Sequence, residues 1–210
     1  MISCICITKN KRELLDAAIR CFKNQTYKDK ELVIVYERCN PNREYLTRLP
    51  YNVIGVEKGK YLLGDLRNMA IERAKGDYIA QWDDDDLSRH DRLEVQMSEL
   101  KKSFYPGCVL TRWIIYFKGK YFISGRRSFW EGSLLIKKDS IEPYHSKAID
   151  EDRPMVRSLF NKGKLLQLDM PYLYIYNYHG NNTWDEKHWI KLVTTFRQPS
   201  EINKPGGIYD

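Results

Sequence analysis

The alternation of short apolar runs with amphipathic stretches over the first hundred residues narrows the fold of this 210-residue chain more than any other feature. Residues 2–7 form an apolar run of strand length, and residues 11–24 follow with apolar side chains at helical spacing. Further runs of both kinds follow, strand-like at 31–36, 52–56 and 77–82 and helical at 65–75. This order predicts an α/β fold of βαβ units, with a mixed, mostly parallel sheet flanked by helices.

The second half of the chain is richer in strand-like runs. Ser88-Arg-His-Asp91 has the form of a capping box that opens a helix, and Gly76 stands where a left-handed helix cap is expected. Strands are predicted at 108–117, 121–124, 133–137, 165–168 and 172–178, and helices at 154–161 and 185–197. With no Pro/Gly linker or repeat to divide it, we expect one domain over 1–210, with a first half at 1–103, a β-rich second half at 104–198 and a loose tail at 199–210.

Composition limits the class of protein further. The 42% of hydrophobic residues suffice for a core, and neither a signal peptide nor a membrane-spanning run is visible, so a cytoplasmic protein is expected. The five cysteines form no Cys-x-x-Cys pair, which favours free thiols over a disulfide framework or zinc site. The 35 basic against 28 acidic residues give a net charge of +7, which favours an anionic partner.

Four consecutive carboxylates, Asp83 to Asp86, follow a predicted strand directly and precede a predicted helix. They should therefore lie at the carboxyl end of a sheet strand, where ligands of open α/β sheets bind. Four adjacent negative charges are unfavourable unless a cation neutralises them, and a hard divalent ion with oxygen ligands meets that need. The alternative is an acidic helix-start loop in solvent.

Several motifs in this order resemble one enzyme family. Gly64-Asp-Leu-Arg-Asn-Met-Ala and Ala74-Lys-Gly-Asp-Tyr-Ile-Ala-Gln-Trp-Asp-Asp-Asp-Asp-Leu are similar to the nucleotide-sugar half of the family 2 glycosyltransferases, which have the GT-A fold. The opening strand, Gln25-Thr-Tyr27 and the run 31–35 extend the resemblance over residues 1–100, and Glu151-Asp152 and His179-Gly-Asn-Asn-Thr-Trp184 resemble the acceptor half. The resemblance implies an inverting transferase that moves a sugar from a nucleotide diphosphate sugar, usually UDP-linked, to an acceptor hydroxyl.

The resemblance also implies roles for individual residues. Asp83 and Asp85 match the carboxylates that hold Mn²⁺ or Mg²⁺, and His179 matches a contact to the metal or diphosphate. A bound dication would stabilise the charge of the departing nucleoside diphosphate. The nucleotide-sugar contacts are expected from Thr8, Glu37, Arg67, Asp83 and Asp84. Arg67 has a second interpretation, as a solvated helix residue or an ion-pair partner of the aspartates.

Inverting transfer needs one general base, and Asp152 matches the family's base. A helix start at this position favours the ionised carboxylate, whereas the plainer interpretation is a helix-entry acid without catalytic role. Glu151 is the neighbour that can exchange roles with it. The acceptor loop is expected at Trp130-Glu131-Gly132, where an aromatic face stacks on a sugar ring or, equally, forms part of the core.

Two positions depart from the family pattern. Tyr36-Glu37 stands where an Asp-Asp pair usually holds the uracil base, and Thr8 stands where proline is common. Glu37 can still accept a hydrogen bond from a pyrimidine, and Tyr36 can stack on the base. Metal dependence is therefore better supported than the identity of the base.

The acceptor class stays open between a glycan, a lipid-linked sugar and a protein side chain, and the oligomeric state is not predicted. The basic pairs Arg126-Arg127 and Lys137-Lys138 suit a peripheral membrane contact or an anionic acceptor, although solvated turns are the simpler interpretation. A nucleotidyltransferase lacks support because residues 8–12 contain no glycine for a phosphate loop. A non-enzymatic nucleic-acid-binding domain, allowed by the pI of about 9.0, is disfavoured by the aspartate run.

Overall fold

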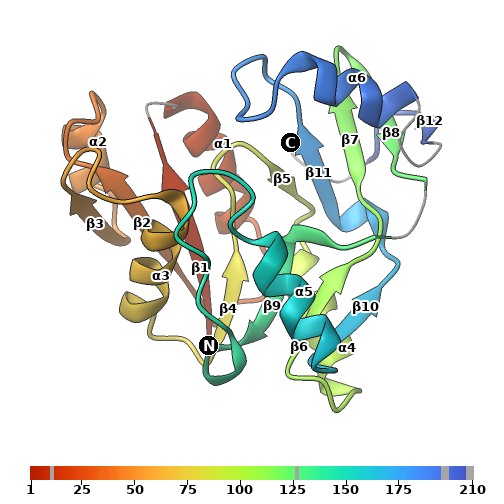
Figure 1. Cartoon of the computed structure of the whole chain (residues 1–210), viewed down its shortest axis with the longest axis horizontal. Helices are drawn as coiled ribbons and strands as arrows, with labels where there is room; N and C mark the ends of the chain where they lie inside the picture. The colour runs from red at the N-terminus through yellow and green to blue at the C-terminus, as the bar shows by residue number, and fades with distance from the viewer. Residues whose placement is uncertain (10–11, 126–127, 195–198, 207–210) are drawn as a thin grey trace.

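A seven-stranded sheet in the order β10-β6-β9-β4-β1-β2-β3 forms the centre of the molecule (Figure 1). The computed structural model describes residues 1–9, 12–125, 128–194 and 199–206. The strands are β1 (Ile2–Thr8), β2 (Lys30–Glu37), β3 (Asn52–Val56), β4 (Tyr78–Gln81), β6 (Gly107–Leu110), β9 (Trp130–Lys137) and β10 (Leu165–Leu168). Only β9 pairs antiparallel with its neighbours within this sheet, so the predicted mixed, mostly parallel α/β sheet is confirmed.

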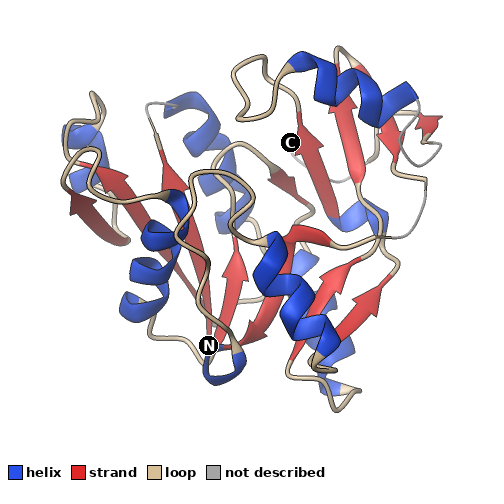
Figure 2. Ribbon diagram, in the orientation of Figure 1, coloured by secondary structure: helices blue, strands red, loops and turns tan. Residues whose placement is uncertain are grey.

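Helices cover both faces of this sheet (Figure 2). The covering helices are α1 (Arg12–Lys23), α3 (Leu63–Arg73), α4 (Arg92–Lys101) and α5 (Arg153–Asn161). Successive strand residues point to opposite faces: Cys6 and Ile34 belong to the core cluster with α1 and α4, whereas Ile5 and Val33 belong to the cluster with α3 and α5. Burial on both faces explains why these strands are continuous apolar runs.

A second, five-stranded sheet in the order β12-β8-β7-β11-β5 lies beyond β6 and β9. Its strands are β5 (Leu87–Ser88), β7 (Ile114–Phe117), β8 (Lys120–Ile123), β11 (Tyr174–Asn177) and β12 (Ser200–Ile202), and α6 (Glu186–Thr194) packs against it. The remaining elements are α2 (Arg43–Thr47) and the 3₁₀ turns η1 (Lys138–Ser140) and η2 (Pro171–Leu173). Because β5 directly follows the aspartate run, this run connects the two sheets.

Several local expectations were wrong. The helix after the aspartates begins at Arg92 with Asp91 as an N-cap that makes no side-chain cap bond, so Ser88 opens no capping box. The run 108–117 divides into two strands in different sheets, and 172–178 divides into η2 and β11. Part of the predicted loose tail forms β12, which pairs with β8. The last predicted helix is described to Thr194, and residues 195–198 lie outside the described residues.

Two glycines permit close backbone approach. A Cβ on Gly76 would lie 2.7 Å from Ser3 Oγ, so this glycine is explained by packing and not by the left-handed cap that the sequence suggested; α3 ends in an extended Ala74. A Cβ on Gly64, in the first turn of α3, would lie 1.8 Å from the carbonyl oxygen of His145. The segment that leads to Asp152 therefore packs directly on the backbone of α3.

All five cysteines are free, and four are buried; Cys39 is exposed. Burial raises the pKa of Cys4 and Cys108 to about 12 and that of Cys21 to about 11. Burial raises the pKa of Cys6 as well. The prediction of free thiols is confirmed. Across the described part of the chain, no helix combines the length and apolar character needed to cross a bilayer.

Candidate active site

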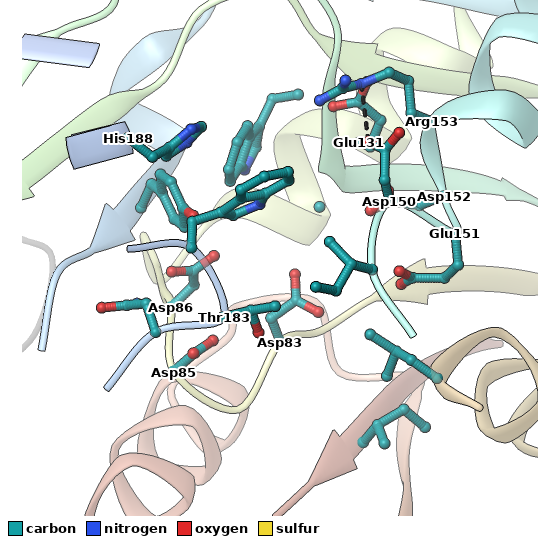
Figure 3. A pocket seen from close by; sticks show the side chains of 18 of the residues that line it. Asp83, Asp85, Asp86, Glu131, Asp150, Glu151, Asp152, Arg153, Thr183 and His188 are labelled. Carbon is teal, nitrogen blue, oxygen red and sulfur yellow. Dashed lines mark ion pairs between the residues drawn. The ribbon is translucent and has the colours of Figure 1, made fainter. Parts of the chain in front are cut away.

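A cavity of about 780 Å³ opens at the carboxyl ends of β1 and β4, where the sequence placed the ligand site (Figure 3). It brings together residues from α3, the aspartate run, the start of β9 and the start of α5. The predicted site residues in its lining are Arg67, Asp83, Asp84, Asp85, Trp130, Glu131, Gly132, Glu151 and Asp152. Thr8, Glu37 and His179 are not part of this lining.

The aspartate run is held in place by the second sheet. Asp86 is 7% exposed and accepts hydrogen bonds from Tyr174 Oη at 2.7 Å and the Asn177 backbone N–H at 2.9 Å. The Asn177 side chain also donates to the Asp85 carbonyl oxygen at 3.0 Å. Burial and the neighbouring carboxylates raise the pKa of Asp86. Asp86 therefore anchors the loop, and the interpretation of the run as a solvated helix start does not fit this packing.

Arg67 bridges two carboxylates that are 68 residues apart in the chain. Its Nη2 donates to Asp83 Oδ1 at 2.8 Å, and its Nε donates to Glu151 Oε1 at 2.7 Å. The Arg67 side chain is only 7% exposed. Paired charges at this depth are shielded from water and act strongly on one another. The ion-pair interpretation of Arg67 is thus confirmed, and the residue joins the aspartate run to the segment that carries Asp152.

Asp152 lies at the start of α5, beside Gln81 at the end of β4. Gln81 Nε2 lies 3.3 Å from Asp152 Oδ2 and 3.4 Å from Asp83 Oδ2, while Tyr144 Oη donates to Gln81 Oε1 at 2.9 Å. Asp152 makes no side-chain cap bond to its own helix. Burial raises the pKa of Asp152, although Arg67 opposes the shift, so the expected lowering by the helix start does not decide its titration.

Glu151 and Asp152 have different surroundings. Glu151 is 3% exposed and its carboxylate is bound to Arg67. Burial raises the pKa of Glu151 while Arg67 lowers it. The longer contacts of Asp152 leave its carboxylate less committed than that of Glu151, which favours Asp152 as the proton acceptor.

The predicted cation ligands are only partly assembled. His179 Nε2 lies 3.1 Å from Asp85 Oδ2, whereas Asp83 is bound to Arg67. Within the described ranges, no three His, Cys, Asp or Glu side chains form a complete metal site. The carboxylate of this pair nevertheless suits Mn²⁺ or Mg²⁺, because such ions prefer oxygen ligands and complete their coordination with substrate phosphates and water.

The positions predicted to bind the nucleotide base have other contacts. Tyr36 is 3% exposed and belongs to the core, so its predicted stacking on a base is not supported. Glu37 accepts the Gly59 backbone N–H at 2.9 Å. Thr8 is 2% exposed and ends β1 beside Tyr36. The nucleotide roles of Thr8 and Glu37 stay predictions.

The predicted acceptor loop contributes both packing and polar groups. Trp130 is half-buried and stacks on Trp113 with ring centroids 4.6 Å apart, which matches the core interpretation of this tryptophan. A Cβ on Gly132 would lie 2.9 Å from Asp83 Oδ2 and from Tyr174 Oη, so this glycine makes room for the aspartate. Of the basic pairs, Lys138 donates to the Ala74 carbonyl oxygen at 2.6 Å, and Arg126 and Arg127 lie outside the described residues.

Glu131 faces the cavity from the start of β9. Arg153 Nε lies 3.6 Å from Glu131 Oε1 and 3.1 Å from Asp150 Oδ1. Figure 3 labels these three residues and marks ion pairs with dashed lines. Burial and the charge of Asp152 raise the pKa of Glu131 from 4.5 to about 7. This carboxyl is thus expected to exchange a proton near neutral pH.

Replacing Glu131 with Gln should make stability less dependent on pH. Because the pKa of Glu131 rises from 4.5 to about 7 on folding, the folded chain binds the proton more tightly, and the wild type loses stability as the pH rises through that interval. We expect the free energy of unfolding of Glu131→Gln, taken relative to that of the wild type, to rise by up to about 3 kcal/mol from pH 4.5 to pH 8. Urea unfolding at the two pH values measures this, and an equal difference at both contradicts it.

The sequence also matches the model of a known protein family. The model of glycosyl transferase family 2 matches residues 3–160, which are three quarters of the chain and include α3, the aspartate run, β9 and the start of α5. The chain belongs to this family. Membership in family 2 favours a glycosyltransferase over the nucleotidyltransferase and the nucleic-acid-binding domain considered above.

Individual similar proteins agree with the family 2 assignment. A cholesterol galactosyltransferase of Borreliella burgdorferi is 29% identical over 121 residues, which cover 55% of this chain and 33% of that protein. Staphylococcus aureus TarS 1–349 in complex with UDP superposes with a TM-score of 0.68 at 14% identity, covering 93% of this chain and 70% of TarS 1–349. The mannosyltransferase PcManGT of Pyrobaculum calidifontis, in complex with GDP-Man and Mn²⁺, superposes with a TM-score of 0.64 at 13% identity. The match covers 90% of this chain and 59% of PcManGT. The fold is therefore GT-A, and the chain spans a third of its curated relative.

Several residues of the site were not identified from the sequence. Gln81 and Tyr174 contact the predicted acids, and Tyr144 donates a hydrogen bond to Gln81. Both tyrosines belong to the hydrophobic core clusters, where an aromatic residue is expected for packing alone. Gln81 carried a usable signal, because a polar residue that ends an apolar strand just before the aspartates is unusual for a core position.

Proposed function

We propose that this family 2 domain transfers a sugar from a UDP-linked sugar to an acceptor hydroxyl with inversion, with Asp152 as the general base. The observation that carries the proposal is that Asp152 and the aspartate run line one cavity at the carboxyl edge of the sheet. A single general-base carboxylate suffices for an inverting displacement, since no covalent intermediate is needed. The UDP-bound TarS and the galactosyl transfer in the relative's name support the donor class.

In this proposal Asp85 and His179, with Asp83, would hold Mn²⁺ or Mg²⁺. The cation, when bound, supplies positive charge to the diphosphate leaving group. Arg67 keeps Asp83 and Glu151 in place, and Asp84, Thr8 and Glu37 complete the nucleotide-sugar contacts. Asp152 accepts the proton of the attacking hydroxyl, and Gln81 orients its carboxylate.

A thermal-shift panel tests the donor class. UDP, UDP-galactose and UDP-N-acetylglucosamine, each with and without Mn²⁺, are compared with GDP and ADP. A ligand at 100 times its dissociation constant stabilises the native state by about 2.7 kcal/mol, so we expect a Mn²⁺-dependent rise in Tm with the uridine nucleotides alone. The anomeric configuration of the product, read by NMR, tests inversion. A larger shift with GDP contradicts the base assignment, and no shift with any nucleotide contradicts the proposed function.

A further inference from the structure

An exposed tryptophan stands on the side of the cavity formed by the segment before α6. Trp184 is 39% exposed and lines the cavity together with His188. The two rings stack with centroids 4.8 Å apart and an interplanar angle of 18°. An aromatic ring covered on one face and left exposed to a cavity offers its other face to a ligand.

Hydrogen bonds and ring contacts hold His188 and the turn that precedes Trp184. The His188 backbone N–H donates to the Asp185 side chain at 3.0 Å, and its ring meets the buried Trp189 edge-on at 6.4 Å. Burial lowers the pKa of His188, so a neutral imidazole backs the indole. The preceding turn is also fixed, because Asn182 accepts the His179 backbone N–H at 3.0 Å and donates to the Asn177 carbonyl oxygen at 2.9 Å.

Charged groups face the same cavity from other elements. Glu131, Asp150 and Arg153 line it and lie apart from His188 in Figure 3. Carboxylates and guanidinium groups form hydrogen bonds with the hydroxyls of a sugar. An apolar acceptor such as a sterol would take these charged groups out of water without replacing their hydrogen bonds to water, which costs free energy even where Arg153 pairs with the two carboxylates. The volume of about 780 Å³ is near the upper end for ligand pockets and leaves room for a second ring beside a donor.

We propose that Trp184, backed by His188, is the stacking platform for the pyranose ring of a carbohydrate acceptor, whose hydroxyls are bound by Glu131, Asp150 and Arg153. The C–H groups on one face of a pyranose carry partial positive charge and meet the negative face of the indole. The polar edge of the same ring meets the charged groups. This inference rests on the proposed function, and it selects a sugar among the acceptor classes left open.

The test uses methyl β-glucoside, methyl β-galactoside and methyl β-N-acetylglucosaminide as acceptors, with cholesterol in detergent micelles as the apolar alternative. The wild type is compared with Trp184→Ala and Trp184→Phe. Tyr172→Ala is the matched control, because Tyr172 is 45% exposed but does not line the cavity. Acceptor KM and kcat are measured with UDP-galactose or the donor selected by the thermal-shift panel, and the Kd for UDP is measured separately.

We expect at least one glycoside to be glycosylated, and Trp184→Ala to raise its KM about tenfold with the Kd for UDP unchanged. Trp184→Phe should keep most of the acceptor affinity of the wild type, and Tyr172→Ala should match the wild type. An unchanged KM in Trp184→Ala, or preferred use of cholesterol, overturns the inference.

Saturation-transfer NMR with the same glycosides, in the presence of UDP, tests binding without turnover. UDP binding without any glycoside contact that depends on Trp184 overturns the acceptor inference and leaves the proposed function standing. If UDP does not bind to the wild type, the proposed function itself is contradicted. The NMR comparison of the wild type with Trp184→Ala then still decides whether the glycoside contacts Trp184.

Discussion

Replacing Asp152 with Asn is expected to lower kcat by about 10²–10⁴ while the Kd for UDP stays within about twofold, since a general base contributes to the barrier and not to donor binding. Asn has nearly the same shape as Asp and can keep a contact with Gln81, so the fold should be preserved. Steady-state kinetics and nucleotide titration measure the two effects.

Two further measurements sharpen this test. Asp139→Asn changes an acid in η1, outside the cavity lining, and should leave kcat unchanged. In the wild type, kcat/KM should fall as the pH is lowered through the pKa of Asp152, which burial raises above its usual value of 3.8. A kcat for Asp152→Asn equal to that of the wild type would assign the base elsewhere, with Glu151→Gln as the next variant to examine.

Replacing Arg67 with Met should lower the free energy of unfolding more than any of the other substitutions described above. It leaves Asp83 and Glu151 without their shared cation, and the Glu151 side chain is only 4% exposed. Removing one partner from a buried ion pair typically costs about 3–5 kcal/mol, because the remaining charge is uncompensated. Chemical denaturation at pH 8 measures the loss, which should shrink at lower pH as the carboxyls take up protons.

Two controls separate the buried geometry from charge alone. Arg48→Met removes an ion pair with Glu44 whose side chains are 75% and 78% exposed, and such surface pairs contribute about 0–1 kcal/mol. Arg67→Lys keeps the positive charge but cannot bridge both carboxylates with a planar guanidinium. If Arg67→Met loses no more stability than Arg48→Met, the bridge does not stabilise the fold.

Local sequence patterns predicted the helices and strands that are long enough for their apolar residues to show a period. The run 2–7 was recognised because the strand is buried along its whole length, and the helix after it was recognised because one of its faces is buried. The five-residue α2 and the three-residue β12 were not predicted, because neither is long enough to show a period. Gly76 was misassigned because its requirement is a contact with Ser3, 73 residues away.

The same distinction applies to the site. The aspartate run and Glu151-Asp152 are visible in the sequence as motifs, and the structure places both on one cavity. The anchoring of Asp86 depends on Tyr174 and Asn177, about ninety residues further along the chain. No local pattern encodes such a pair, so separating the anchoring aspartate from those proposed to bind a ligand required the three-dimensional fold.

The unequal burial of the five thiols makes this protein suitable for selective chemical labelling. Thiolates are the reactive form, and burial suppresses both ionisation and access at Cys4, Cys6, Cys21 and Cys108. Cys39, two residues after the end of β2, is the thiol that a maleimide can reach in the native state. A fluorophore attached there would sit on the loop beyond Glu37 and would test the predicted nucleotide contact of that residue without any engineered cysteine.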